Sequence, residues 1–370
     1  MRQADGYRWL RRYAPIAIAF ATYAALRLSA IGLGSGSGGT SLFPGWSVVA
    51  VALGTYLWKL VVPLPLNAYI AELPGGAGFV AASALGIAAV VAFSAVAARR
   101  GWRPTVALLV WIAAGIAPSL AILVKLPEVP VAERYLYFPS VGFCLLAGQL
   151  AALALVQRRA AVRWTVAAAA VAILVSCTVI AARRNRVWES DRRLWTDTTA
   201  KSPTAGLPLR SLAVVLQNAG QTDEARVMYE RALEKHNTVG GRITIYNNLG
   251  SMVLLRGDLD TAERYYRQAL AIQETPDCVF NLGVISLTRA REAGARGDEA
   301  GRRREAQLAL PLLEKAERTS PHDPDIQVAL GQSLSFLGKH EEARRHYERA
   351  LSLGISGATA DQIRSMLVRP

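Results

Sequence analysis

The sequence predicts an all-α protein in which a polytopic transmembrane helix bundle precedes an α-solenoid of repeated helical hairpins. Three observations support this: long apolar stretches, an uneven charge distribution and self-similarity in the second half. Of the 370 residues, 52% are hydrophobic and only 19% are charged, which is unusual for a soluble protein. The first 182 residues hold 14 Lys and Arg against 4 Asp and Glu, and the remainder holds 28 against 24. We therefore expect a transmembrane domain at 1–182.

Five or six apolar segments approach the roughly 20 residues that cross a bilayer. They lie at about 13–33, 44–64, 77–98, 104–124, 135–156 and 164–182. The first could be mistaken for a signal peptide, but no convincing cleavage site follows it, so we expect a retained anchor. Lys59, Pro63 and Pro65 interrupt the second segment, which we expect to be re-entrant or to lie flat on the membrane.

Basic residues in short loops predict the orientation of the chain. They are Arg2, Arg8, Arg11 and Arg12, then Arg99, Arg100 and Arg103, then Arg158, Arg159 and Arg163. Because cytoplasmic loops are enriched in Lys and Arg, the second half of the chain is expected outside. A cluster at Arg183, Arg184 and Arg186 opposes this orientation. Membrane topology explains the basic surplus better than nucleic-acid binding does.

Several classes of site find no support in the sequence. The three cysteines form no disulfide framework. The four histidines, of which His340 and His346 are interpreted as surface residues of a charged helix, lack metal-ligand spacing. The GSGSGG stretch at 34–39 lacks the following lysine and the flanking strand of a phosphate-binding loop. We expect no metal site, no cofactor and no nucleotide site.

Four aligned segments in the second half predict repeated helical hairpins. They are ALEKHN (232–237), ALAIQE (269–274), AERTSP (316–321) and ALSLGI (350–355). The same alignment superposes turn glycines at 220, 257 and 338, and large residues at 229, 266, 313 and 347. The pattern resembles four tetratricopeptide repeats (TPRs) over roughly 206–357. Small residues also align, at Ala225, Ala262, Ala309 and Ala343. They should let the two helices of a hairpin approach, and the large residues should fill the gap between neighbouring hairpins.

The regions around the repeats are also predicted. The third repeat carries about 14 extra residues, EAGARGDEAGRRRE at 292–305, which form a loop or a helix extension. Their polar, glycine-containing character favours a solvated flap. Residues 183–205 are expected to form a linker helix. Residues 358–370 are expected to form a capping helix that covers the last repeat.

A peptide-binding groove is the expected function of such repeats. Asn248 and Asn281 occupy equivalent positions, where side-chain amides can donate to and accept from an extended peptide backbone. The alternative is that asparagine is merely tolerated on a solvated helix face, as Ser211 and Ala329 at the matching positions suggest.

Four stretches in order resemble the later part of the transmembrane and tetratricopeptide-repeat protein O-mannosyltransferases and their bacterial relatives. They are RLSAIG (27–32), YLWKLVVPLPLNAY (56–69), AERYLYFPSVGF (132–143) and RRNRVWESDRRLWTDTTAKSP (183–203). The resemblance implies a GT-C membrane glycosyltransferase that transfers a sugar from a polyprenyl-phosphate donor to a protein hydroxyl on the outer side. It also implies a bacterial inner (plasma) membrane location, with the repeats in the periplasm. The family's acidic motif lies upstream of the matched region, and the first outer loop here, 34–45, has no carboxylate.

A lipid-phosphate site is predicted at the outer membrane face. In this hypothesis Glu133 orients Arg134 toward the phosphate, and Arg27, Lys59, Tyr135 and Tyr137 are possible helpers. The alternatives are a purely structural Glu133–Arg134 pair and an Arg27 that snorkels to the membrane surface. No catalytic residue is assigned. Two functions remain open: a glycosyltransferase component whose repeats bind acceptor protein, and a non-catalytic membrane-anchored TPR scaffold for envelope protein assembly.

Overall fold

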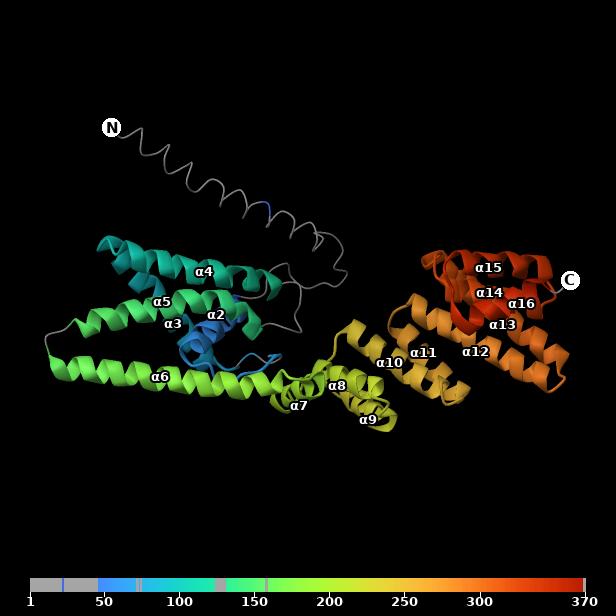
Figure 1. Ribbon diagram of the computed structural model, residues 1–370, viewed down its shortest axis with the longest axis horizontal. Coiled ribbons are helices and arrows are strands. Elements are labelled where there is room, and N and C mark those ends of the chain that lie inside the picture. The colour runs from blue at the N-terminus through green and yellow to red at the C-terminus, as the bar shows by residue number, and fades with distance from the viewer. Residues whose placement is uncertain are drawn as a thin grey trace, which may run out of the picture. The chain divides into compact units, whose positions relative to one another are not determined.

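The computed structural model describes residue 22 and residues 46–70, 73, 75–123, 131–156 and 159–368. The chain divides into two compact units, Met1–Gly45 and Trp46–Pro370, and the elements below belong to the second. Apart from residue 22, the predicted first span lies outside the described residues, as do the loop at 34–45 and Arg27. Within the described ranges the fold is all-helical, as predicted, and contains only isolated β-bridges (Figure 1).

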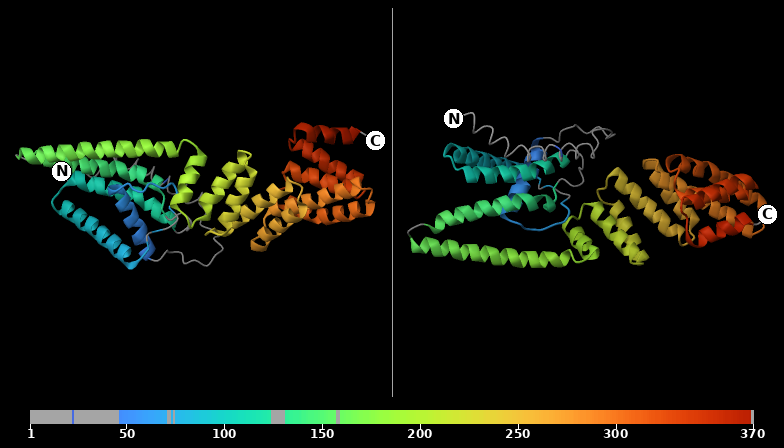
Figure 2. Two further views of the ribbon diagram at one scale, coloured as in Figure 1. Left: turned by 90° about the horizontal axis from the view of Figure 1, so that it is seen from below. Right: turned by 45° about the horizontal axis from the view of Figure 1, so that its top comes forward.

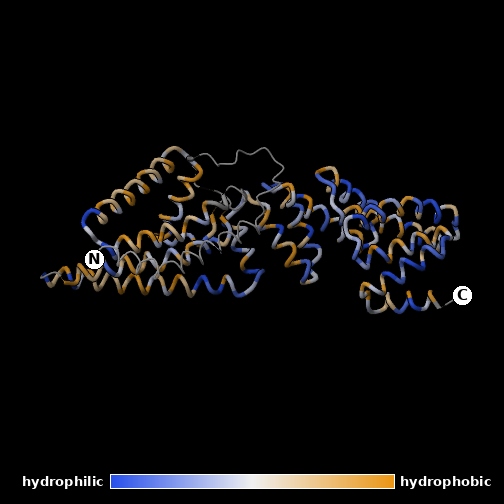
Figure 3. The backbone as a smooth tube through the Cα atoms, turned by 90° about the horizontal axis from the view of Figure 1, so that it is seen from above, coloured by the Kyte–Doolittle hydropathy of each residue, from blue (hydrophilic) through white to orange (hydrophobic). Residues whose placement is uncertain are grey.

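Apolar helices form the first part of this unit. They are α2 (Trp46–Val61), α3 (Ala77–Arg99), α4 (Arg103–Leu123), α5 (Tyr137–Leu155), which follows the short 3-10 helix η1 (Glu133–Leu136), and α6 (Ala160–Val187). In the described residues, the stretches 77–99, 103–120, 133–155 and 160–187 are long and apolar enough to cross a membrane. Hydrophobic residues dominate these helices over most of their length (Figure 3). Helix α2 is shorter and ends two residues before Pro63.

Close packing joins the apolar helices where side chains are small. A Cβ atom on Gly142 of α5 would lie 2.9 Å from Cδ1 of Trp111 in α4, and one on Gly115 would lie 2.8 Å from Cγ of Pro139. Both distances are below ordinary van der Waals contact, so only glycine permits this approach of α4 and α5. Around Tyr56 of α2, a small buried core connects α2 and α4 with residues 131–136.

The second part of the unit consists of paired antiparallel helices, visible as successive hairpins in Figures 1 and 2. A connecting helix, α7 (Asp191–Lys201), precedes them. The pairs are α8 (Gly206–Asn218) with α9 (Thr222–Leu233), α10 (Val239–Leu254) with α11 (Leu259–Ile272), α12 (Pro276–Ala295) with α13 (Glu299–Thr319), and α14 (Pro324–Phe336) with α15 (His340–Ser352). Helix α16 (Gly357–Val368) follows, and its Ile363 is buried against the last hairpin.

The large residues of the repeats pack within their own hairpin and against the next one. In the second hairpin, a Cβ on Gly250 would lie 2.8 Å from the Tyr266 ring, and in the fourth, one on Gly331 would lie 2.5 Å from Tyr347. The large side chain therefore packs onto the small residue of its own hairpin partner. The expected place between neighbouring hairpins is also confirmed, because Tyr266 shares a buried cluster with Ile285 of α12 in the third hairpin.

The insertion in the third hairpin lengthens both helices and forms no flap. Helices α12 and α13 have 20 and 21 residues, whereas those of the other hairpins have 12 to 16. The turn itself is conserved in geometry: Gly297 has φ 78° and Gly257 has φ 83°. Asp298 and Asp258 then cap the following helix by accepting from a backbone N–H three residues on. The helix extension that the sequence allowed is therefore confirmed, and the solvated flap was wrong, because the insertion itself contains this turn.

Candidate functional site

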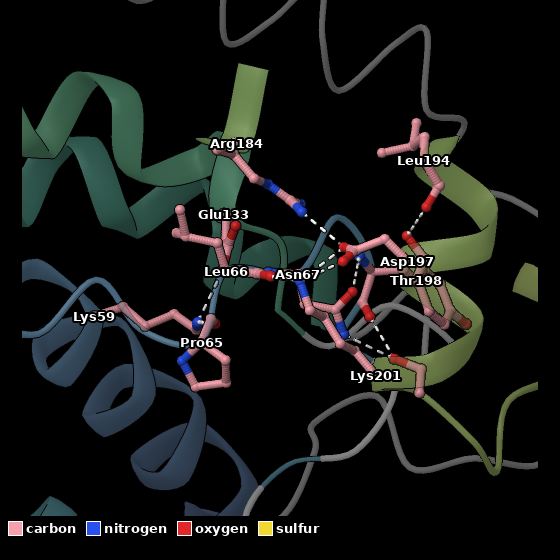
Figure 4. A network of polar contacts seen from close by, with 12 residues as sticks. Lys59, Pro65, Leu66, Asn67, Glu133, Arg184, Leu194, Asp197, Thr198 and Lys201 are labelled. Carbon is pink, nitrogen blue, oxygen red and sulfur yellow. Dashed lines mark hydrogen bonds and ion pairs between the residues drawn. The ribbon is translucent and has the colours of Figure 1, made fainter. Parts of the chain in front are cut away.

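Three segments that are far apart in the sequence meet in one polar network (Figure 4). Lys59 and Asn67 come from the end of α2 and the loop after it, and Glu133 begins η1. The third segment is the end of α6 and helix α7, up to Ser202. These segments lie within three of the four stretches, 56–69, 132–143 and 183–203, on which the expected family relationship rests.

Lys59 and Glu133 form the centre of this network. The Nζ atom of Lys59 lies 2.9 Å from Oε1 of Glu133, and only 9% and 16% of the two side chains are exposed. Lys59 Nζ also donates to the Pro65 carbonyl at 2.7 Å. The same Oε1 of Glu133 accepts from the backbone N–H of Asn67 at 2.8 Å. These two charges, which have little contact with solvent, are therefore paired and hydrogen-bonded, as buried charges require.

Asn67 extends the network to the segment after α7. Its Nδ2 donates to Oγ of Ser202 at 2.9 Å, and that hydroxyl donates to the Tyr69 carbonyl at 2.7 Å. The Asn67 Oδ1 accepts from the backbone N–H of Tyr69 at 3.3 Å. Asn67 and Ser202 are both buried.

Helix α7 also makes a hydrogen bond and two ion pairs in this network (Figure 4). Lys201 Nζ donates to the Leu66 carbonyl at 2.8 Å and lies 2.7 Å from Oδ1 of Asp197. Nη1 of Arg184, near the end of α6, lies 2.8 Å from Oδ2 of Asp197. Arg184, one of the basic residues that oppose the predicted topology, therefore forms an ion pair within the protein.

The expected pairing of Glu133 with Arg134 is replaced by another arrangement. Glu133 pairs with Lys59, whereas the exposed guanidinium of Arg134 lies over the Tyr135 ring, 5.2 Å from its centroid. Consecutive residues of a 3-10 helix point about 120° apart, so neighbours in η1 do not face each other. The Tyr137 side chain is also exposed. The structure therefore brings Lys59 and Glu133 together and leaves Arg134 and Tyr137 accessible.

The two asparagines of the predicted groove make separate contacts. Asn248 Nδ2 donates to the Tyr229 hydroxyl at 2.9 Å, and this hydroxyl donates to Gln217 Oε1 at 3.0 Å. Asn281 Nδ2 donates to Oδ1 of Asn247 at 3.3 Å, which joins α12 to α10. Asn247, which directly precedes Asn248, was not predicted from the sequence. All three asparagines are half-buried.

These helices define a helical-hairpin solenoid attached to apolar helices. Family models of the tetratricopeptide repeat match residues 204–275 and 295–359, so the C-terminal part of the chain contains TPRs, as predicted. Solved structures that are similar to part of this chain include MamA (17% identity over 46% of this chain and 91% of that chain, with a TM-score of 0.35). A second is a TPR protein of Thermus thermophilus, with 23% identity over 44% of this chain and 79% of that chain and a TM-score of 0.36. A third is pilF of Pseudomonas aeruginosa, with 18% identity over 50% of this chain and 82% of that chain and a TM-score of 0.37. A search of curated proteins finds no match.

Proposed function

We propose that this chain is a membrane-embedded TPR protein that presents a bound protein segment to a lipid-linked sugar. In this proposal the membrane domain, 1–182, binds a polyprenyl-phosphate-sugar, and the repeats, 206–357, bind the acceptor protein. The chain would act as a component of a GT-C-type protein O-glycosyl(mannosyl)transferase. The observation that supports it is the convergence of Lys59, Glu133 and Ser202, because segments of the family resemblance meet in one network.

Arg134 is the group that we assign to the lipid phosphate. Its guanidinium is exposed, and Glu133 forms its ion pair with Lys59 instead. A guanidinium pairs well with phosphate oxygens. The exposed Tyr137 hydroxyl, three residues along, supplies a further donor. Lys59 has a supporting role in this revised assignment, because its ammonium already contacts Glu133 and the Pro65 carbonyl. Arg27 remains a candidate from the sequence, and Tyr135 remains one as the residue whose ring lies beneath the Arg134 guanidinium.

Binding of polyprenyl phosphate in nanodiscs tests this assignment. Arg134→Ala should weaken binding by about tenfold, the expected contribution of one charge-assisted contact. Arg183→Ala removes another exposed arginine and should leave binding unchanged. Equal binding by wild type and Arg134→Ala, with both folded, would refute the phosphate role.

The repeats are proposed to hold the acceptor along the face that carries Asn247 and Asn281. A photo-crosslinking residue at position 281 should capture the same protein segment that receives the sugar. The matched control is position 267, whose arginine is exposed on α11. Crosslinking of that segment at 267 and not at 281 would place the binding surface elsewhere.

A non-catalytic scaffold is the second candidate, and the Lys59–Glu133 pair favours it. Oε1 of Glu133 already accepts from two donors, as expected for a structural carboxylate. Transfer of labelled mannose from polyprenyl-phosphate-mannose to co-expressed envelope proteins separates the two functions. Transfer that depends on this chain supports the glycosyltransferase component. Crosslinking at 281 without transfer supports the scaffold.

A further inference from the structure

The connection between the apolar helices and the TPRs, helix α7 and the residues just after it, contacts both of these parts. On one side, Ser202 bonds to Asn67 and Tyr69, and Lys201 bonds to Leu66. On the other side, Trp195 of α7 packs against the core of the first hairpin. The contacts on both sides therefore involve the same short helix and the residues that follow it.

Residues 204–206 continue this attachment directly into the first hairpin. The backbone N–H of His236 donates to the Thr204 carbonyl at 2.9 Å, and that of Gly206 donates to the His236 carbonyl at 2.8 Å. Only Pro203 separates Ser202 from this second set of bonds. Because the ring of Pro203 fixes its φ angle, the chain between the two sets of bonds has little conformational freedom.

Both the backbone N–H and the side-chain amide of Asn67 are hydrogen-bonded within the protein. Its backbone N–H donates to Glu133, its Nδ2 donates to Ser202, and its Oδ1 accepts from Tyr69. Separating the buried Asn67 amide from these partners costs free energy. Any state that breaks the hydrogen bonds leaves polar groups without partners or requires water to enter.

We propose that the Asn67–Ser202 contact is an interlock that fixes the first TPR hairpin on the membrane domain. Glu133 holds the backbone of Asn67, Asn67 holds Ser202, and Ser202 holds the start of the first hairpin. The interlock thereby sets the position of the repeats relative to η1, which carries Arg134. This inference concerns the internal connection of the chain and does not depend on the identity of any ligand.

Hydrogen–deuterium exchange of the full chain in detergent tests the interlock. The informative amides are those of Ser202, Ala205 and Gly206, each of which donates to a backbone carbonyl. Asn67→Ala and Ser202→Ala should each speed exchange there by about tenfold, as expected for the loss of a buried hydrogen bond. Ser202→Thr keeps a hydroxyl and should restore most of the protection.

Thr196→Ala is the matched control on the same helix. Its hydroxyl donates to the Arg192 carbonyl at 2.7 Å and is exposed, so its loss should leave exchange at 202–206 unchanged. Exchange in Asn67→Ala within twofold of wild type would overturn the interlock, as would an equal effect of Thr196→Ala.

A cysteine pair tests the same contact without requiring either alanine variant to fold. In a background with Cys144 and Cys177 replaced by alanine, Asn67→Cys with Ser202→Cys should form an intramolecular disulfide on oxidation, detectable by mass spectrometry of linked peptides. Asn67→Cys with Thr196→Cys should not form one. Linking of the control pair but not of the 67–202 pair would overturn the proposed contact. Lipid-phosphate binding is not measured in either experiment, so their failure is distinguishable from failure of the proposed function.

Discussion

Lys59 and Glu133 are 74 residues apart in the sequence, yet their charged atoms lie 2.9 Å apart in a half-buried network. Removal of one partner leaves the other charge with reduced solvation, which costs more than the pair itself contributes. We expect Lys59→Met to lower the free energy of unfolding by about 2–3 kcal/mol, measured by thermal unfolding in detergent. Lys339→Met breaks an exposed pair with Glu342 and should cost less than about 0.5 kcal/mol. Equal effects of the two variants would argue against a structural role for Lys59.

Gly250 is predicted to be intolerant of a side chain. The added Cβ of Gly250→Ala would lie 2.8 Å from the Tyr266 ring, and the resulting overpacking should destabilise the protein by about 1–3 kcal/mol. Gly240→Ala, in the same helix, has open space and should be neutral or stabilising by up to about 1 kcal/mol. Urea unfolding of the two variants measures the difference. A Gly250→Ala variant as stable as Gly240→Ala would contradict the packing described.

His346 is predicted to make the stability of the repeats dependent on pH. Its Nδ1 lies 2.8 Å from Oε1 of the fully buried Gln327, whose Nε2 donates to Glu317. Burial lowers the pKa of His346 from its ordinary 6.5; the charge of Glu317 opposes this change, and Arg349 acts in the same direction as burial. The interpretation of His346 as a simple surface residue is thus incorrect.

The sign of the pH effect follows from the lowered pKa. Between the folded pKa and 6.5, the unfolded chain binds more protons than the folded chain. The free energy of unfolding should therefore decrease as the pH falls through 6.5 and should level off below the folded pKa of His346. Urea unfolding between pH 7.5 and 5.5 should show this decrease in wild type and in the exposed-site control His340→Gln. In His346→Gln, the free energy of unfolding should fall less over the same pH range. A fall as large as that of the wild type would assign the effect to other groups.

The proposed membrane orientation predicts opposite accessibility for two exposed positions. In a cysteine-free background, Thr244→Cys, on α10 of the repeats, should react with a membrane-impermeant maleimide on intact spheroplasts. Arg100→Cys, in the turn between α3 and α4, should react only after permeabilisation. The reverse pattern would place the repeats in the cytoplasm.

The all-helical fold was predictable because its signals are local. Apolar stretches long enough to cross a bilayer, such as 77–98, need no tertiary information. Neither does the repeated alignment of small, large and turn residues, since each hairpin contacts mainly its neighbours. Pro63 and Pro65 likewise indicated that α2 would stop early, and it ends at Val61.

The sequence by itself therefore determined the apolar helices, the TPR hairpins and the order in which these segments follow one another. Only the tertiary structure decided which of those segments meet. It paired Glu133 with Lys59 in place of its neighbour Arg134, bonded Asn67 to Ser202 across 135 positions, and turned the 292–305 insertion into longer helices. The physical reason is that side-chain pairing depends on direction and distance in space, and spacing along the chain specifies these only within a single element.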